Sequence, residues 1–168
     1  WGEMEILQRL ISDARSSSTR RRILAGWEAN GNGRDIIDLR FSHASGGTAI
    51  EVKTSTTSRT HHINGMGQVT VPEGHSNGLL ASLHIREVDG THGTTTEQLC
   101  RHLETLAIGS EEEVEDYLSL LVKKLELRGR GCLDDRFRFA STSTSLHLID
   151  MSDVPKPILE GGVMEVEW

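Results

Sequence analysis

Four stretches of the chain repeat apolar residues every three to four positions, which is the spacing of an amphipathic helix. In the first stretch, Met4, Leu7 and Ile11 fall on one face. Thr19 and Ser110 stand where a hydroxyl can cap the start of a helix. These patterns predict helices over residues 2–14, 20–29, 94–108 and 110–129.

Shorter runs alternate apolar and polar residues, which is the pattern of a half-buried strand. Two of these runs, residues 35–41 and 48–54, are separated by the segment SHASGG. Its two glycines supply the positive φ that a hairpin turn needs. Further strands are expected over residues 61–71, 77–88, 136–140, 145–151 and 162–168.

Strands in the middle of the chain, with helices before and after them and more strands at the end, predict a mixed α/β (α+β) fold. The length of 168 residues corresponds to about one domain, so we expect a single domain over residues 1–168. The chain has no starting Met and stops in the strand-like sequence VMEVEW. We therefore expect it to have been trimmed from a longer protein.

The two runs of the expected hairpin carry charged residues among the apolar ones. Because side chains alternate across a strand, Glu51 and Lys53 share one face of the second run. A turn centred between Ala44 and Ser45 places Asp38 directly opposite Glu51. Opposed side chains have Cβ atoms roughly 4.5–5.5 Å apart, so this register brings two carboxylates together, with Lys53 about 7 Å further along the strand.

Two opposed carboxylates repel each other, and a divalent cation between them removes that repulsion. Mg²⁺ suits such a site because it binds one or two carboxylates, keeps several waters and accepts a substrate phosphate oxygen. Such a metal activates water and offsets charge at phosphorus, while a lysine orients the water or stabilises the developing charge. Asp38, Glu51 and Lys53 together therefore indicate metal-assisted hydrolysis of a phosphodiester.

Two other interpretations of these residues stay open. A charged pair on an alternating strand is commonly a solvated ion pair that contributes little to stability. The register is also an inference, and a slip by one residue moves every side chain to the other face. Asp35 is the rival carboxylate, since the same register places it opposite Thr54.

The order of a helix, a strand with an aspartate, a hairpin and a strand with Glu-x-Lys resembles the PD-(D/E)xK phosphodiesterase superfamily. More narrowly, the stretch IEVKTSTTSRTHHINGMGQV resembles an uncharacterised bacterial group of PD-(D/E)xK motif proteins. The opening WGEMEILQRL and the closing residues 146–168 resemble the two ends of the same group. The matching positions of the central stretch are Glu51, Lys53, Thr54, His61 or His62, Ile63 and Gln68.

The resemblance implies a role for individual residues. Asp38 and Glu51 would bind the metal, with help from the main-chain carbonyl of Val52. Lys53 would be the catalytic lysine, and Glu3 would be the additional acidic residue that some members bring to the metal. The implied cofactor is Mg²⁺ or Mn²⁺, and the implied substrate is DNA.

The resemblance also implies a restriction-endonuclease-like fold, with a mixed central sheet flanked by helices and extended by C-terminal strands. His62 and Gln68 would position the substrate or water. Members of the group occur among bacterial restriction and phage-defence genes, so the implied protein partners are a second copy of the chain or other defence proteins. No proline precedes Asp35 or Asp38, and this departure from the family pattern leaves open which of the two binds the metal.

The net charge of −7 argues mildly against nucleic acid as a partner, but the charge is unevenly distributed. Residues 1–62 hold nine Lys/Arg and seven Asp/Glu, a balance of +2, whereas residues 63–168 hold nine and eighteen, a balance of −9. The first part is therefore the part suited to a polyanion. The acidic remainder favours an alternative function, a catalytically inactive interaction module with the same fold.

No run of 18 apolar residues predicts a membrane span, and the N-terminal residues do not resemble a signal peptide. Cys100 and Cys132 form no C-x-x-C pair, and Cys100 falls on an apolar helical face, where we expect it in the core. These features predict a cytoplasmic protein without a membrane partner.

Overall fold

The computed structural model describes residues 1–28, 37–43, 46–57, 61–63, 66–89, 92–128, 138–140, 145–154 and 164–166, apart from the side chains of His62 and of residues 164–166. The chain divides into two compact units. The helical unit comprises Trp1–Asp35 and Glu87–Ala140, and the sheet unit comprises Ile36–Arg86 and Ser141–Trp168. The single domain expected over residues 1–168 stays a prediction.

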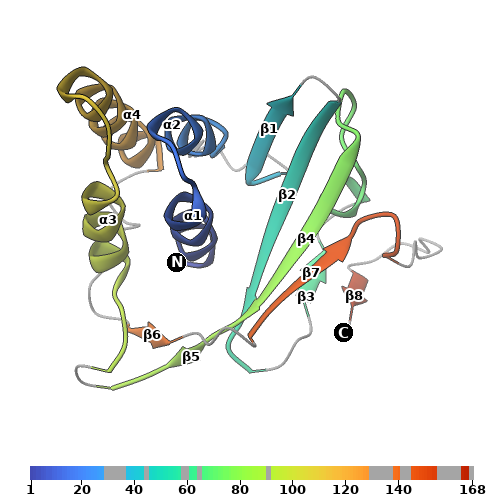
Figure 1. Ribbon diagram of the computed structural model, residues 1–168. Coiled ribbons are helices and arrows are strands. Elements are labelled where there is room, and N and C mark those ends of the chain that lie inside the picture. The colour runs from blue at the N-terminus through green and yellow to red at the C-terminus, as the bar shows by residue number, and fades with distance from the viewer. Residues whose placement is uncertain are drawn as a thin grey trace. The chain divides into compact units, whose positions relative to one another are not determined.

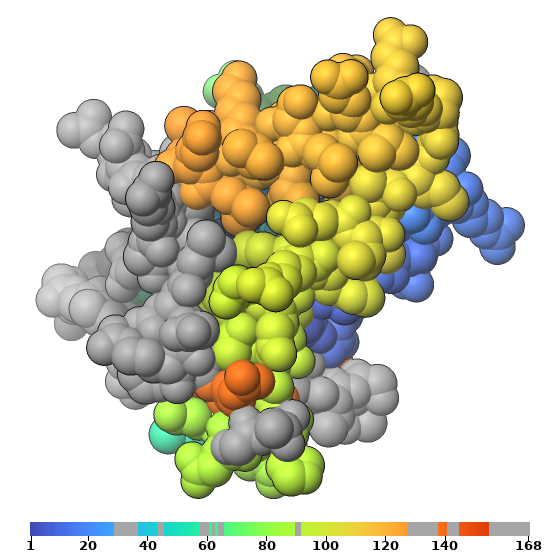
Figure 2. All heavy atoms as spheres, turned by 90° about the vertical axis from the view of Figure 1, so that its left-hand side faces the viewer, coloured from blue at the N-terminus to red at the C-terminus, as the bar shows by residue number. Residues whose placement is uncertain are grey.

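Four α-helices make up most of the described part of the helical unit (Figure 1). They confirm the four predicted helices, three with shorter bounds and α2 displaced towards the N-terminus. The bounds are Gly2–Asp13 for α1, Ser17–Ala25 for α2, Thr96–Thr105 for α3 and Glu111–Arg128 for α4. Figure 2 looks onto a face of this unit that α3 and α4 form. Within the described ranges, no helix is long and apolar enough to cross a membrane.

Side-chain hydroxyls cap the starts of α2, α3 and α4. Ser110 accepts a hydrogen bond from the Glu113 N–H, and the Glu113 carboxylate accepts one from the Ser110 N–H at 2.8 Å, so the predicted Ser110 cap is confirmed. The prediction that Thr19 caps α2 is wrong, because Ser16 is the N-cap and its Oγ accepts the Thr19 N–H at 3.2 Å. An N-cap hydroxyl binds the N–H two or three residues further on, and Ser16 has that spacing to Thr19.

Trp27 and Cys100 are buried in the helical unit, and the predicted core position of Cys100 is confirmed. Buried polar atoms need hydrogen-bond partners, and two such bonds connect elements of this unit. The Trp27 indole Nε1 donates to Glu3 Oε2 at 3.1 Å. The Tyr117 hydroxyl of α4 donates to the Leu103 carbonyl of α3 at 2.9 Å.

A mixed four-stranded sheet in the order β1-β2-β4-β7 is the main feature of the sheet unit (Figure 1). β2 and β4 run parallel, whereas β1 and β7 run antiparallel to their neighbours. Together with the helices, this sheet confirms the α/β (α+β) class. The strands of this sheet are β1 Leu39–His43, β2 Gly46–Ser55, β4 Asn77–His84 and β7 Leu146–Asp150. Two further sheets have two strands each. One pairs β3 His61–Ile63 with β8 Met164–Val166, and the other pairs β5 Arg86–Glu87 with β6 Phe139–Ala140.

Strand boundaries differ from the predicted ones in the middle of the chain. Among the described residues of the run predicted over residues 61–71, only β3 is a strand, and Met66–Val69 form the 3₁₀ helix η1. Gly67 lies within η1 and has low strand propensity. The run predicted over residues 77–88 is interrupted at the buried Ile85, which separates β4 from β5.

The β1–β2 pairing has the register that the sequence predicted. Its five pairs run from Leu39 opposite Ile50 to His43 opposite Gly46. Asp38 lies one residue before the first of these pairs, and the same register extended by one residue would place it opposite Glu51. The acidic pair is therefore a product of the hairpin, because residues close in the sequence set their own alignment.

β3 and η1 pack on the face of the sheet that carries Glu51. Glu51 pairs with Leu80 of β4, and paired residues of neighbouring strands point to the same face. Leu80 belongs to a buried cluster with Ile63 of β3 and Val69 of η1. The charged residues of β2 thus lie beside an apolar core rather than on an open surface.

Candidate functional site

Asp38 lies where the chain enters β1. Its Oδ2 accepts a hydrogen bond from the main-chain N–H of Val52 at 2.7 Å. Hydrogen bonds to an ionised acceptor are roughly twice as strong as neutral ones, so this contact fixes the Asp38 carboxylate against β2, at the residue that follows Glu51. The rival carboxylate, Asp35, lies outside the described residues.

Glu51 and Lys53 form a buried ion pair. The Lys53 Nζ lies 2.9 Å from Glu51 Oε1, and the two side chains are 15% and 4% exposed. Residues two apart in a strand share a face, which is why the ammonium reaches the carboxylate. An ionised carboxylate is very unfavourable in a buried position unless a cation compensates its charge. The interpretation of Glu51 and Lys53 as a solvated ion pair is therefore wrong, because both side chains are largely buried.

Arg40 brings a second cationic side chain to the same face. It pairs with Ala49, and Ala49 shares a face with Glu51 because the two are two residues apart. Within the described part of the chain, the Arg40 Nε is a buried side-chain nitrogen without a hydrogen-bond partner. A buried donor that lacks an acceptor costs about 1–3 kcal/mol. The Nε is therefore a buried donor that the described residues leave unsatisfied.

A histidine and a serine complete the surroundings of Lys53. Ser82 of β4 pairs with Lys53 of β2, and its Oγ lies 2.6 Å from Nε2 of His61, with both residues buried. Burial, and secondly the charge of Lys53, hold the pKa of His61 below its ordinary value of 6.5. The imidazole is therefore neutral near pH 7.

The sequence resemblance included His61 or His62 but not Ser82. The His61 ring bonds Ser82, and the charge of Lys53 contributes to its lowered pKa. No sequence signal indicated Ser82, since it comes from β4 and reaches Lys53 only through the parallel pairing of β2 and β4. Such pairing between distant segments leaves no local pattern in the sequence.

A pocket of about 390 Å³, here called the Lys53 pocket, opens beside these residues. It lies at the carboxyl ends of β2 and β4, and the carboxyl ends of parallel strands are where ligands bind in open α/β sheets. Its walls are Lys53, Thr54, Ser55, Thr56, Thr57, His61 and Ile85.

Three further predicted site residues have partial descriptions. Glu3 belongs to the helical unit, where it accepts the hydrogen bond from Trp27. Gln68 lies half-buried in η1. The His62 backbone is part of β3, and its side chain lies outside the description. The roles of these residues at a metal or a substrate stay predictions.

The donor set of Asp38 and Glu51 fits a hard divalent cation. Both donors are carboxylates, and Mg²⁺ binds through one or two carboxylates and water. A carboxylate has about four acceptor positions. Asp38 uses one for the Val52 N–H and Glu51 uses one for Lys53, so each carboxylate has acceptor positions left for a metal ion. Over the described ranges, no three His, Cys, Asp or Glu side chains group in a way that could hold a metal ion.

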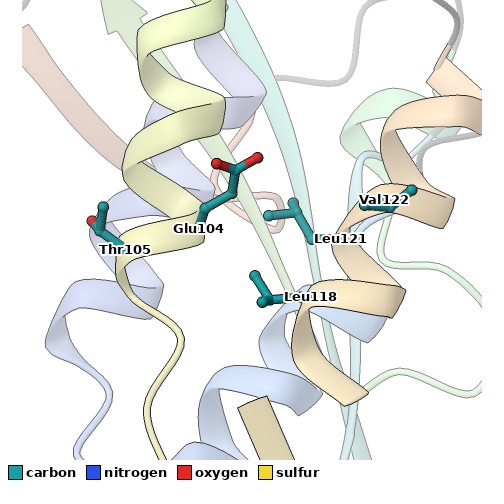
Figure 3. A pocket seen from close by; sticks show the side chains of 5 residues that line it. All are labelled: Glu104, Thr105, Leu118, Leu121 and Val122. Carbon is teal, nitrogen blue, oxygen red and sulfur yellow. The ribbon is translucent and has the colours of Figure 1, made fainter. Parts of the chain in front are cut away.

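The helical unit has a pocket of its own, here called the α3–α4 groove (Figure 3). Its volume is about 420 Å³. Leu118 and Leu121 project from α4 towards α3 in Figure 3, and Val122 lies beside them. Glu104 and Thr105 of α3 form the opposite wall.

A scan against protein-family models, a search of curated proteins and a search of solved structures find no match for this chain. The resemblance to the PD-(D/E)xK superfamily therefore stays a prediction from the sequence. The residues that bear on function are those of the sheet unit, above all Asp38, Glu51 and Lys53.

Proposed function

We propose that the chain is a metal-dependent nuclease that hydrolyses phosphodiester bonds of DNA. The observation that supports this most is the grouping of Asp38, Glu51 and Lys53 on one hairpin. One carboxylate is fixed at the Val52 N–H, and the other is buried against the lysine. Two carboxylates can hold a divalent cation, and a neighbouring amine can stabilise charge at a phosphate, so this set suits metal-assisted phosphodiester hydrolysis.

In this proposal Asp38 and Glu51 hold Mg²⁺ or Mn²⁺. When bound, the cation supplies activation of the attacking water and neutralisation of charge at the phosphate. Lys53 pairs with Glu51 and lines the Lys53 pocket, where its amine can contact a substrate phosphate.

A second function, a catalytically inactive interaction module, has its own support. Lys53 already compensates the Glu51 charge, and Val52 already donates to Asp38, so the carboxylates have structural roles without any metal. The balance of −9 over residues 63–168 also disfavours a wide contact with DNA. Both functions fit a cytoplasmic bacterial defence setting, with a second copy of the chain or other defence proteins as partners.

DNA cleavage in Mg²⁺ or Mn²⁺ tests the proposal directly. Wild-type protein should cut DNA, and Glu51→Ala or Lys53→Ala should lower the rate about 10³-fold or more, because metal and lysine together supply several kcal/mol of transition-state stabilisation. Glu51→Gln keeps the size of the side chain and should lose cleavage as well.

Val122→Ser in the α3–α4 groove is the matched control, and its cleavage rate should equal that of wild type. Circular dichroism of each variant establishes that loss of activity is not loss of folding. Unchanged cleavage in both Glu51→Gln and Lys53→Ala would exclude this site. No cleavage by wild type under either metal would favour the interaction module.

A further inference from the structure

The walls of the Lys53 pocket are rich in hydrogen-bond donors. Four consecutive hydroxyl residues, Thr54 to Thr57, follow Lys53 along the chain and line the pocket with it. The His61 ring is buried and held by Ser82. Ile85 is the apolar member of the described lining.

These side chains are the kinds that contact phosphate. Lysine, serine and threonine donate hydrogen bonds to phosphate oxygens, and such contacts carry no information about the base sequence. Recognition of single bases commonly uses stacking on an aromatic ring. Among the described residues that line the pocket, none has a Phe, Tyr or Trp ring.

The size and place of the pocket limit what it can hold. Pockets for small ligands have volumes of about 300–1,000 Å³, so a volume of about 390 Å³ fits one nucleotide unit rather than a longer stretch of strand. Lys53 is at once a wall of the pocket and the partner of Glu51. A group in the pocket therefore lies next to the acidic pair.

We propose that the Lys53 pocket binds one backbone phosphate of the nucleic-acid strand, adjacent to the bond that is cut, through Lys53 and the hydroxyls of Thr56 and Thr57. This inference rests on the proposed nuclease function and specifies its substrate recognition. The chain takes up the strand by its sugar–phosphate backbone and without preference for the base. Thr56 and Thr57 are exposed members of the described pocket lining, so their hydroxyls are accessible to a strand.

Binding of mononucleotides to the full chain in EDTA tests this inference independently of catalysis. The probes are the four deoxynucleoside 5′-monophosphates, inorganic phosphate and the matching nucleosides, measured by NMR chemical-shift titration. The four monophosphates should bind with affinities within about threefold of one another, because phosphate contacts do not read the base. The nucleosides should bind at least about tenfold more weakly, since they lack the charged group.

Thr56→Val with Thr57→Val keeps the shape of both side chains and removes their hydroxyls, and it should weaken monophosphate binding about tenfold. Thr70→Val replaces an exposed threonine of the sheet unit outside the pocket and should bind like wild type. Equal binding of nucleosides, a preference above about tenfold for one base, or unchanged binding by the double variant would each overturn the inference.

The two proposals fail in different ways. Cleavage of DNA by wild type, without phosphate-dependent binding at the pocket, would overturn the phosphate pocket alone. Phosphate-dependent binding without cleavage in Mg²⁺ or Mn²⁺ would support the pocket and overturn the nuclease function.

Discussion

The Lys53 pocket and the α3–α4 groove have nearly the same volume, about 390 Å³ and 420 Å³, but opposite chemistry. The first has a buried ion pair and a hydrogen-bonded histidine at its wall. The second is lined on the α4 side by Leu118, Leu121 and Val122. Volume alone therefore does not identify a functional site. The two pockets differ in buried charge. Burial of a charged side chain is costly, whereas burial of an apolar side chain is favourable, so buried charge is the better indication of function.

Of the substitutions considered, breaking the Glu51–Lys53 ion pair should change the free energy of unfolding most. Lys53→Met leaves the Glu51 carboxylate buried without its cation, and the loss of one partner of a buried pair costs about 3–5 kcal/mol. Because Lys53 is 15% exposed, we expect the lower end of that range. Urea unfolding in EDTA measures the free energy of unfolding.

Adding Glu51→Gln to Lys53→Met removes the uncompensated charge and should restore part of that stability. Val122→Ser, in the groove, should change the free energy of unfolding by less than about 0.5 kcal/mol, as exposed positions usually do. If Lys53→Met lowered the free energy of unfolding as little as Val122→Ser, buried charge would not distinguish the Lys53 pocket from the α3–α4 groove.

Metal addition should act at the two acids beside the Lys53 pocket and not at the α3–α4 groove. A cation held by Asp38 and Glu51 stabilises the folded state by about 2.7 kcal/mol at a concentration one hundred times its Kd. Thermal melting against Mg²⁺ or Mn²⁺ should show a rising midpoint in wild type and in Val122→Ser. Glu51→Gln should show a flat midpoint, and a rise equal to that of wild type would remove Glu51 from the metal site.

A neutral hydrogen bond joins α4 to α3, the two helices that line the groove, and the loss of this bond should be milder than the loss of the ion pair. Tyr117→Phe removes the donor to the Leu103 carbonyl and should cost about 1 kcal/mol in urea unfolding at pH 7. Burial raises the pKa of Tyr117 to about 12, above its ordinary value of 10.

A raised folded pKa means that the contribution of Tyr117 is complete below pH 10 and is lost as the pH rises towards 12. Tyr117→Phe should therefore show a weaker decline of stability than wild type in that range. Parallel curves for the two proteins would contradict burial of the phenol.

The smallest effect should be a pH dependence at the Lys53 pocket. The folded pKa of His61 is lowered, so its contribution to stability is present above the ordinary value of 6.5 and is lost as the pH falls below it. The slope stays below about 1.4 kcal/mol per pH unit, the limit for one proton. Urea unfolding between pH 7 and pH 5 should show a shallower decline for His61→Gln, while NMR of the wild-type imidazole locates its pKa.

Helices and the hairpin could be predicted because their signals are local. The cap at Ser110 and the pairing of Leu39 with Ile50 both depend on residues near in the sequence. Even a local signal is ambiguous where several hydroxyls follow one another, and this is why Ser16 rather than Thr19 caps α2.

The surroundings of the acidic pair could not be predicted in the same way. Ser82 reaches Lys53 because β4 pairs in parallel with β2, and a parallel pair needs a long crossover that no short pattern specifies. The burial of Glu51 depends on the cluster of Leu80, Ile63 and Val69, which forms only when β3 and η1 pack on the sheet. Sequence therefore located the charged residues, and tertiary packing determined their environment.

The β1–β2 hairpin also has a consequence for the order in which the chain folds. Closing a short loop costs less conformational entropy than closing a long loop. The contact of Asp38 with β2 can therefore form early in folding. The His61–Ser82 contact has a sequence separation of 21 residues. It cannot form before β4 packs against β2, because Ser82 belongs to β4. The acids and the lysine thus travel together on one short piece of chain, and a nascent or partly unfolded protein would assemble its charged centre before the cavity beside it exists.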